Sequence, residues 1–137
     1  MLSKTFGLWF DDQIPSGTAQ MKRYDGRSKR FFMSKKLQQT YDTYMKELSE
    51  HRPECPIQGA VQLGLIFCYS IKDKKKRGKY KTSRPDCDNV GKILIDCMTR
   101  SGFWLDDCQI VRLNVTKQYS EGERAYIIVD YKEVFDD

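Results

Sequence analysis

The sequence predicts a single α+β domain over residues 1–137, built from a mixed β-sheet and two main α-helices. Runs typical of β-strands alternate with two segments whose apolar residues recur at helical spacing. The chain has 137 residues, of which 39% are hydrophobic and 31% are charged, so it is long and apolar enough for one packed core. No internal repeat or low-complexity tract divides the sequence, which favours one domain.

The N-terminal half predicts a strand, a loop and a helix. Residues 5–10 alternate apolar side chains, as a strand does, whereas residues 18–32 are polar and basic and predict a loop or irregular ribbon. Ser34 is a candidate helix N-cap. The helix after it carries an apolar face and ends before Pro53; this face comprises Leu37, Tyr41, Tyr44, Met45 and Leu48.

The C-terminal half predicts a strand, a second helix and a pair of strands. Residues 60–71 are rich in strand formers and predict a central strand. Residues 88–102 have apolar side chains at helical intervals and end at Gly102, a candidate C-cap. Residues 109–119 and 124–131 alternate and flank the tetrapeptide Ser-Glu-Gly-Glu, which predicts a β-hairpin.

Positive charge is concentrated in one segment. Residues 72–84 contain eight Lys or Arg and one Asp, a net charge of +7, whereas the whole chain carries +5. Such a segment is the expected footprint of phosphate-backbone binding, although a solvated charged loop has the same composition. The candidate DNA-binding residues in it are Lys72, Lys74, Lys75, Lys76, Arg77, Lys79, Lys81 and Arg84.

Several classes of protein are disfavoured. The longest apolar stretches are far too short to cross a bilayer, and the N-terminus does not have the pattern of a signal peptide, so we expect a cytoplasmic protein without a membrane partner. The five cysteines lack any C-x-x-C spacing, and we expect most of them to be core residues in a reducing compartment. His51 is the only histidine, which excludes a site that needs two.

Carboxylates follow the basic segment directly. Asp86 and Asp88 would project from the same face of an extended chain, and Pro85 favours an extended chain. Two neighbouring carboxylates favour a cation between them, and Mg²⁺ is the usual ion in such an oxygen-rich site. Asp106 and Asp107 must point in different directions, so one could be a third ligand while the other serves as a cap.

Lys92 follows Asp88 by four residues, so the two share a face if this segment is helical. Its ammonium could hold the metal ligands, orient a water molecule or offset charge on phosphate oxygens, which suits phosphodiester hydrolysis. The alternative is purely structural: Asp88 is an N-cap paired with Lys92, and the other aspartates belong to turns and caps. Spacing alone does not decide between these interpretations.

Residues 84–117, "RPDCDNVGKILIDCMTRSGFWLDDCQIVRLNVTK", resemble the core of the RusA family of Holliday-junction resolvases. In that family an R-x-D-x-D-N-x-x-K block leads into a helix, then into G-x-W-x-D-D-x-Q and a strand that ends in lysine. Residues 14–44 resemble the family's N-terminal part more loosely. The positions that match the family pattern are Asp86, Asp88, Asn89, Lys92, Gly102, Trp104, Asp106, Asp107, Gln109 and Lys117.

The resemblance implies a homodimeric endonuclease that depends on Mg²⁺, with Mn²⁺ able to replace it, and that uses no small-molecule cofactor. It implies paired symmetrical nicks in four-way DNA junctions during recombination and repair. The implied metal ligands and catalytic residues are Asp86, Asp88 and Asp107, with Lys92 as a further catalytic residue. Asp106 and Asn89 would support them, and Lys117 would join the DNA-binding set.

The resemblance also implies a bacterial, phage or prophage protein. Two features depart from the family pattern: residues 15–18 read Pro-Ser-Gly-Thr where the family often has Pro-Ser-Asn-Asn, and the basic loop is longer. Two other functions stay open as alternatives. One is a module that binds branched DNA without cutting it, and the other is a nuclease that acts mainly on flaps and forks.

Overall fold

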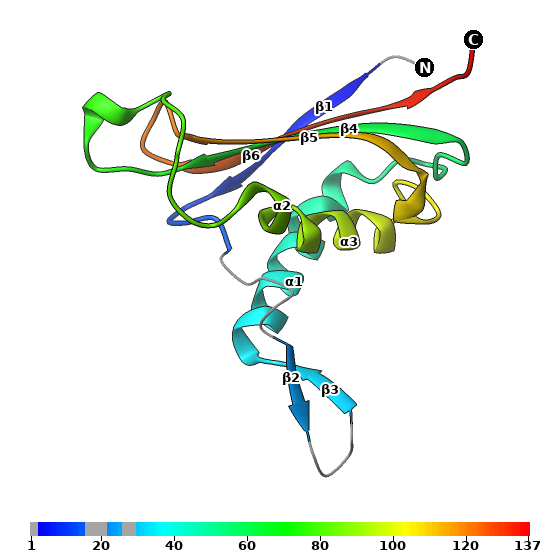
Figure 1. Cartoon of the computed structure of the whole chain (residues 1–137), viewed down its shortest axis with the longest axis horizontal. Helices are drawn as coiled ribbons and strands as arrows, with labels where there is room; N and C mark the ends of the chain where they lie inside the picture. The colour runs from blue at the N-terminus through cyan, green and yellow to red at the C-terminus, as the bar shows by residue number, and fades with distance from the viewer. Residues whose placement is uncertain (1–2, 16–21, 26–29) are drawn as a thin grey trace.

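A computed structural model of the chain describes residues 3–15, 22–25 and 30–137, with side chains described for residues 3–15 and 34–137. It has the α+β fold expected from the sequence, with a mixed four-stranded sheet and two main helices, α1 and α3 (Figure 1). The strands are β1 (Lys4–Phe10), β2 (Lys22–Asp25), β3 (Arg30–Met33), β4 (Ala60–Tyr69), β5 (Ile110–Tyr119) and β6 (Ala125–Val134). The helices are α1 (Lys35–Leu48), α2 (Cys87–Val90) and α3 (Lys92–Arg100), with 3₁₀ turns η2 (Ser49–His51), η3 (Lys74–Lys76) and η4 (Asp107–Gln109).

The four-stranded sheet has the order β1-β6-β4-β5, with β4 and β5 parallel and the other pairs antiparallel. The predicted hairpin is therefore wrong, because β4 lies between the two strands that were expected to pair. The physical reason is burial. Val61, Leu63, Leu65 and Phe67 of β4 are at most 1% exposed, so this strand gains most by taking a central place. A parallel neighbour then requires a crossover, which α2 and α3 provide.

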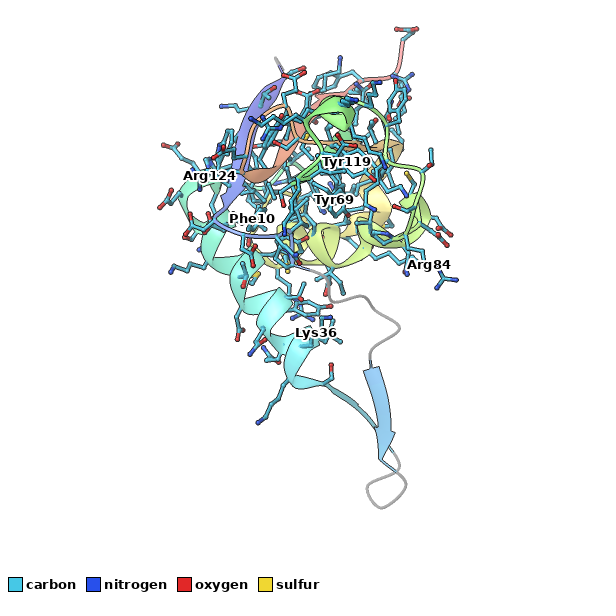
Figure 2. The ribbon with its side chains drawn as sticks, turned by 90° about the vertical axis from the view of Figure 1, so that its left-hand side faces the viewer. Phe10, Lys36, Tyr69, Arg84, Tyr119 and Arg124 are labelled. Carbon is cyan, nitrogen blue, oxygen red and sulfur yellow. The ribbon has the colours of Figure 1, made fainter. Side chains whose placement is uncertain are left out.

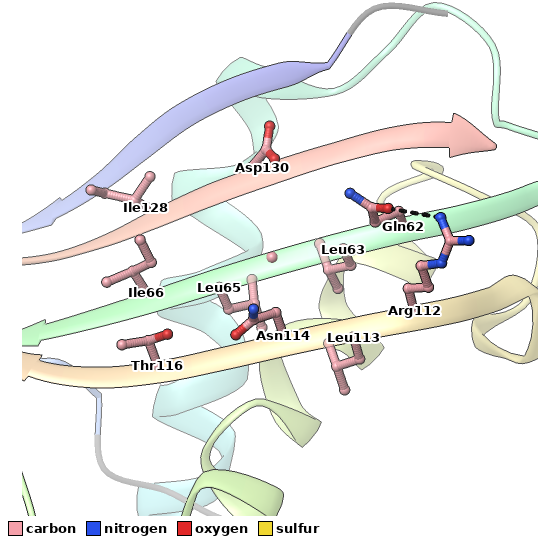
Figure 3. A pocket seen from close by; sticks show the side chains of 11 residues that line it. Gln62, Leu63, Leu65, Ile66, Arg112, Leu113, Asn114, Thr116, Ile128 and Asp130 are labelled. Carbon is pink, nitrogen blue, oxygen red and sulfur yellow. Dashed lines mark hydrogen bonds between the residues drawn. The ribbon is translucent and has the colours of Figure 1, made fainter.

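The helices cover one face of the sheet (Figure 1). The core between the two layers includes Leu37 and Tyr44 of α1 and Leu94 and Met98 of α3, all nearly or fully buried. The opposite face of the sheet carries a shallow hollow, whose sides are formed by β4, β5 and β6 (Figure 3). In this hollow Arg112 donates a hydrogen bond to Gln62 at 3.3 Å. The sheet thus has one packed face and one open face.

The first helix begins as expected, because the Ser34 hydroxyl accepts a hydrogen bond from the backbone N–H of Leu37 at 3.2 Å. The segment before it differs from the expectation of a loop or irregular ribbon. There β2 and β3 pair as a short antiparallel ribbon, which extends beyond the start of α1 (Figure 1). The departure from the family pattern at residues 16–18 lies outside the described residues.

The second predicted helix is divided into α2 and α3 at Gly91, which is buried. A Cβ atom at this position would lie 3.3 Å from Leu65 Cδ1 and 3.8 Å from Val115 Cγ2. Glycine therefore lets the junction between the two helices approach β4 and β5 closely. The end of α3 is as expected: Gly102 follows the helix with a φ of +86°.

Burial of the cysteines corrects one expectation. Only Cys68 and Cys97 lie in the interior, whereas Cys55, Cys87 and Cys108 are exposed free thiols. In the ranges that the structure describes, no helix is both long and apolar enough to cross a membrane.

Candidate active site

The D-x-D segment lies at the start of α2. Asp86 is the N-cap residue, with φ −72° and ψ 145°, and Asp88 lies within the first helical turn. The expectation that both aspartates project from an extended chain is therefore wrong, because the chain turns into a helix directly after Asp86. The Asp86 side chain makes no capping hydrogen bond. Both carboxylates are exposed, and neither has a hydrogen bond or ion pair with any described residue.

Lys92 begins α3, and its side chain shares a shallow pocket of about 250 Å³ with Asp88. The floor and walls of this pocket come from α2, α3 and β5 and include Cys87, Gly91, Ile95, Leu113 and Val115. No ion pair joins Asp88 to Lys92, so the structural alternative, in which these residues merely stabilise a helix end, lacks its expected contacts. The two charged groups remain available to a ligand.

Asn89 is half-buried beside the two aspartates, and its Oδ1 atom is buried with no hydrogen-bond donor among the described residues. Buried polar atoms almost always have a partner, which can be an ordered water or an ion. The start of α2 therefore combines two exposed carboxylates without partners and one buried oxygen atom without a donor. Oxygen atoms of these kinds are the ligands that Mg²⁺ and similar hard cations prefer.

The second acidic segment forms η4. Asp106 is the N-cap residue, and its carboxylate accepts a hydrogen bond from the backbone N–H of Cys108 at 3.0 Å. Gln109 completes a capping box, because its side-chain oxygen accepts from the N–H of Asp106 at 2.8 Å. The same Gln109 amide donates to the carbonyls of Ile57 and Gly59, at 2.8 and 2.9 Å. Both aspartates are exposed, but only Asp106 caps η4, so Asp107 is the member of the pair without a capping role.

Electrostatics separate the two neighbouring aspartates. The N–H of Cys108 lowers the pKa of Asp106, whereas contact with the Asp106 carboxyl group raises the pKa of Asp107. The Asp96 carboxylate also raises the pKa of Asp107, consistent with the packing of η4 against α3. A carboxylate whose charged form is disfavoured in this way gains from a nearby cation.

The structure does not bring all three predicted metal ligands into one cluster. Within residues 3–15, 22–25 and 30–137, no group of three or more His, Cys, Asp or Glu side chains is placed to hold a metal ion. Asp86 and Asp88 lie at the start of α2, whereas Asp107 lies in η4, after the end of α3. Asp86 and Asp88, two residues apart at the start of α2, are the pair of carboxylates left as candidate ligands in one protomer.

The predicted DNA-binding residues fall into two groups. Lys72, Lys74, Lys75, Lys76, Lys79 and Arg84 are exposed, and Arg84 projects from the surface (Figure 2). Lys81 and Lys117 are half-buried and make contacts within the protein. Arg77 is also half-buried, and its Nε atom has no partner among the described residues. The basic loop that contains most of these residues lies directly before the D-x-D segment, at the end of β4 (Figure 1).

Asp96 is a neighbour of the site that sequence reasoning missed. Its carboxylate accepts a hydrogen bond from the Tyr41 hydroxyl at 2.7 Å and pairs with Arg100 at 3.2 Å. The sequence did contain a signal, because Asp96 follows Lys92 by four residues and therefore continues the helical row that begins at Asp88. The contact between α3 and η4 is a tertiary feature that spacing does not predict.

Carboxylates without described partners beside a lysine, with a strongly basic loop next to them, are the arrangement expected of a protein that acts on nucleic acid. The comparisons agree. A family model described as "Endodeoxyribonuclease RusA" matches residues 13–130. The chain belongs to the RusA family, and it is a hydrolase that acts on DNA.

Three relatives show how far the similarity extends. The chain is 32% identical over 117 residues to the crossover junction endodeoxyribonuclease rusA of Lactococcus phage r1t, an alignment that covers 85% of this chain and 89% of the relative. It is 32% identical over 92 residues to the uncharacterized protein YqaN of Bacillus subtilis strain 168, covering 59% of this chain and 64% of that protein. A segment of 34 residues is 50% identical to RusA of Escherichia coli strain K12, covering 25% and 28% of the two chains.

Proposed function

We propose that this protein is a Mg²⁺-dependent endonuclease that resolves four-way DNA junctions by paired nicks, in recombination and repair. Membership of the RusA family supports the substrate, since the phage relative is named for cleavage of crossover junctions. The observation that carries the proposal is the set of carboxylates at the start of α2, which have no partner among the described residues and lie beside Lys92 and a loop of charge +7.

The residues that would hold the ion are Asp86 and Asp88, with the Asn89 oxygen nearby and Asp107 as the third carboxylate. A bound divalent cation supplies positive charge that makes a water molecule more acidic and stabilises charge on the attacked phosphate. Mg²⁺ is commonly held by one or two carboxylates, with water and substrate phosphate as the other ligands. The two carboxylates of α2 are compatible with such a site, and Mn²⁺ is proposed as a substitute.

Lys92 is proposed to act on the phosphate itself. Its exposed ammonium shares the pocket with Asp88 and has no ion-pair partner among the described residues. A scissile phosphate in that pocket would have a positive group beside its non-bridging oxygens, whose negative charge grows as the nucleophile attacks. Ile95, Leu113 and Val115 provide an apolar wall, which limits competing hydration of these charges.

The exposed lysines of the basic loop are proposed to bind the phosphate backbone on either side of the cleaved bond. Backbone contacts recognise the shape of a branched DNA molecule without reading its base sequence. Since the loop leads directly into Asp86, DNA that binds to the loop would be delivered to the carboxylates. We propose that these events take place in the bacterial cytoplasm, during expression from a bacterial, phage or prophage gene.

A homodimer is proposed as the active form. A four-way junction has approximate twofold symmetry, and an isologous dimer presents two identical sites to its two opposed strands. The described residues of one protomer do not bring the three proposed carboxylates into one group, which adds a second argument, because a partner could bring further oxygen ligands to each site. Large apolar side chains exposed beside η4 and on β5, namely Leu105, Val111 and Leu113, are compatible with such contact.

The test is a synthetic four-way junction incubated with the protein and Mg²⁺, and analysed for symmetrical nicks on opposed strands. Asp88→Asn is expected to bind the junction as tightly as the wild type and to abolish cleavage. Asp136→Asn, which removes one carboxylate far from the site in the sequence, is the matched control and should cleave normally. Wild-type cleavage by Asp88→Asn would refute the metal-ligand assignment.

The range of substrates is measured in the same assay. Flaps, replication forks and linear duplexes are offered beside the four-way junction at equal concentration. We expect the junction to be cleaved fastest, because its symmetry matches that of a dimer. Faster cleavage of flaps or forks would instead make the protein a general branched-DNA nuclease.

A further inference from the structure

Lys117, expected from the sequence to contact DNA, makes its side-chain contacts inside the protein. Its Nζ atom donates hydrogen bonds to the carbonyl oxygens of Ser83 at 2.7 Å and of Pro85 at 2.5 Å. Pro85 directly precedes Asp86, the N-cap residue of α2. An ammonium group has three N–H donors, so two of them are committed to the segment that leads into the carboxylates.

The same segment is held at a second point. The backbone N–H of Lys81 donates to the carbonyl of Lys117 at 3.0 Å, which adds a short stretch of the basic loop to the edge of β5. The Lys81 ammonium lies 2.5 Å from the Ser83 hydroxyl and 5.3 and 5.7 Å from the ring centres of Tyr69 and Tyr119. These two rings belong to paired positions of β4 and β5 and lie close together (Figure 2).

The lysines of the basic loop and of the end of β5 therefore fall into two classes, exposed and half-buried. Lys74, Lys75, Lys76 and Lys79 are exposed, and no described residue is a side-chain partner of theirs. Lys81 and Lys117 are half-buried and hold residues 83–85 against the end of β5. Charge-assisted hydrogen bonds are short and strong, so a phosphate would have to displace them before it could bind Lys117.

We propose that Lys117 is a positioning residue of the active site: by binding the Ser83 and Pro85 carbonyls it sets the place and direction in which α2, and hence Asp86 and Asp88, leave the basic loop. The inference rests on the proposed function for its catalytic consequence. The first helical turn depends on this placement, since the N–H groups of Asn89 and Val90 both bond to the Asp86 carbonyl, at 3.1 and 3.0 Å.

The experiment compares Lys117→Met with Lys79→Met in the full-length protein. Both variants lose one positive charge and keep an aliphatic side chain, but only Lys117 contacts residues 83–85. Three quantities are measured: hydrogen exchange at the Asn89 and Val90 amides, the Mg²⁺ concentration that half-saturates junction cleavage, and the salt dependence of junction binding in Ca²⁺. Lys117→Arg tests whether donor groups at this position restore function.

Lys117→Met is expected to speed exchange at Asn89 and Val90 and to raise the half-saturating Mg²⁺ concentration about tenfold, as loss of groups that orient metal ligands does. Its salt slope should equal that of the wild type, and Lys117→Arg should recover part of the Mg²⁺ response. Lys79→Met should instead make the slope of log affinity against log salt shallower by about 0.9, the value for one phosphate contact, with wild-type exchange.

The proposal is overturned if Lys117→Met behaves like Lys79→Met, because Lys117 would then be a phosphate ligand, and equally if all three quantities match the wild type. Should Lys117→Met fail to fold, as judged by circular dichroism, Lys117→Gln takes its place under the same criteria. If the wild-type protein does not cleave junctions, the proposed function fails. The exchange at Asn89 and Val90 then still decides the role of Lys117, since that measurement needs no DNA.

Discussion

Asp86 and Asp88 lack the contacts that a structural role would give them, and this absence is informative at the scale of single residues. Asp106 shows the contrast, since it caps η4 and engages Cys108 and Gln109. Neighbouring carboxylates without partners cost stability through repulsion, unless a ligand offsets the charge. The exposed aspartates are therefore better explained by binding than by folding.

Lys92 allows a direct test of the charge beside the phosphate. Lys92→Ala is expected to slow junction cleavage about 100-fold, because the ammonium no longer stabilises charge on the phosphate oxygens, while thermal unfolding stays close to that of the wild type. Single-turnover cleavage at saturating protein measures the rate, and Lys46→Ala on α1 is the control. Full activity of Lys92→Ala would make this lysine an ordinary surface residue.

Asp107 should show a trade between stability and activity. The pKa of Asp107 is raised in the folded state, so its ionised form lowers the stability of the fold at neutral pH. This destabilisation is lost as the pH falls through the raised pKa and then through the ordinary pKa near 4. Asp107→Asn is therefore expected to raise the melting temperature at pH 7 in EDTA and to have little effect near pH 3. The same variant should lose cleavage.

Calorimetry at pH 7 and pH 3 measures this difference. Asp106→Asn is a useful comparison, because the pKa of Asp106 is lowered in the folded state. Its ionised form therefore stabilises the fold above the ordinary pKa, and this stabilisation is lost as the pH falls through the lowered pKa. The two substitutions should thus shift stability at pH 7 in opposite directions. A fall in melting temperature for Asp107→Asn at pH 7 would contradict the argument.

At the scale of elements, the structure assigns separate tasks to short segments. Gly91 divides the crossover into α2, which carries the acidic residues, and α3, which is anchored in the core. The capping box of η4 orients Asp107, and Gln109 ties that turn to the chain before β4. The candidate residues of the site are thus presented by short helices and turns that lie outside the four-stranded sheet.

The basic loop is the element expected to determine affinity. Replacement of Lys74, Lys75 and Lys76 by Ala should weaken junction binding and make its salt dependence shallower by about 2 to 3, because up to three phosphate contacts are lost. Fluorescence anisotropy at several salt concentrations measures both quantities. The control replaces Lys4, Lys46 and Lys132, which lowers the net charge equally from outside the loop. An unchanged salt slope would mean that the loop is only a solvated turn.

At the scale of the whole molecule, one protomer offers an incomplete arrangement. The described residues of a single chain do not gather the three proposed ligands into one group. One face of the sheet also stays uncovered, with the hollow between β4, β5 and β6 (Figure 3). Paired nicks on opposed strands also need two sites. Both considerations support a dimer as the working unit.

A subunit-mixing experiment tests that dimer. Wild type mixed with excess Asp88→Asn should form mixed dimers, which cut one strand and so accumulate nicked junctions that are not resolved. Gel analysis of a supercoiled plasmid that extrudes a cruciform distinguishes nicked circles from linear products. If resolved products persist in proportion to the wild-type protein alone, the two active sites do not act within one dimer.

The sequence by itself determined the α+β class, most element positions and the choice of the aspartates and Lys92 as candidates for the site. These properties are local: apolar periodicity, caps such as Ser34, and the D-x-D-N-x-x-K spacing depend on neighbours within a few residues. Only the tertiary structure decided that β4 separates β5 from β6 and that Lys117 binds the Ser83 and Pro85 carbonyls. It also decided that, among the described residues, Asp86, Asp88 and Asp107 do not form one group of ligands. Those outcomes depend on burial and on contacts between segments that are distant in the sequence. Such contacts compete with local preferences and produce no periodic pattern of residues from which they could be predicted.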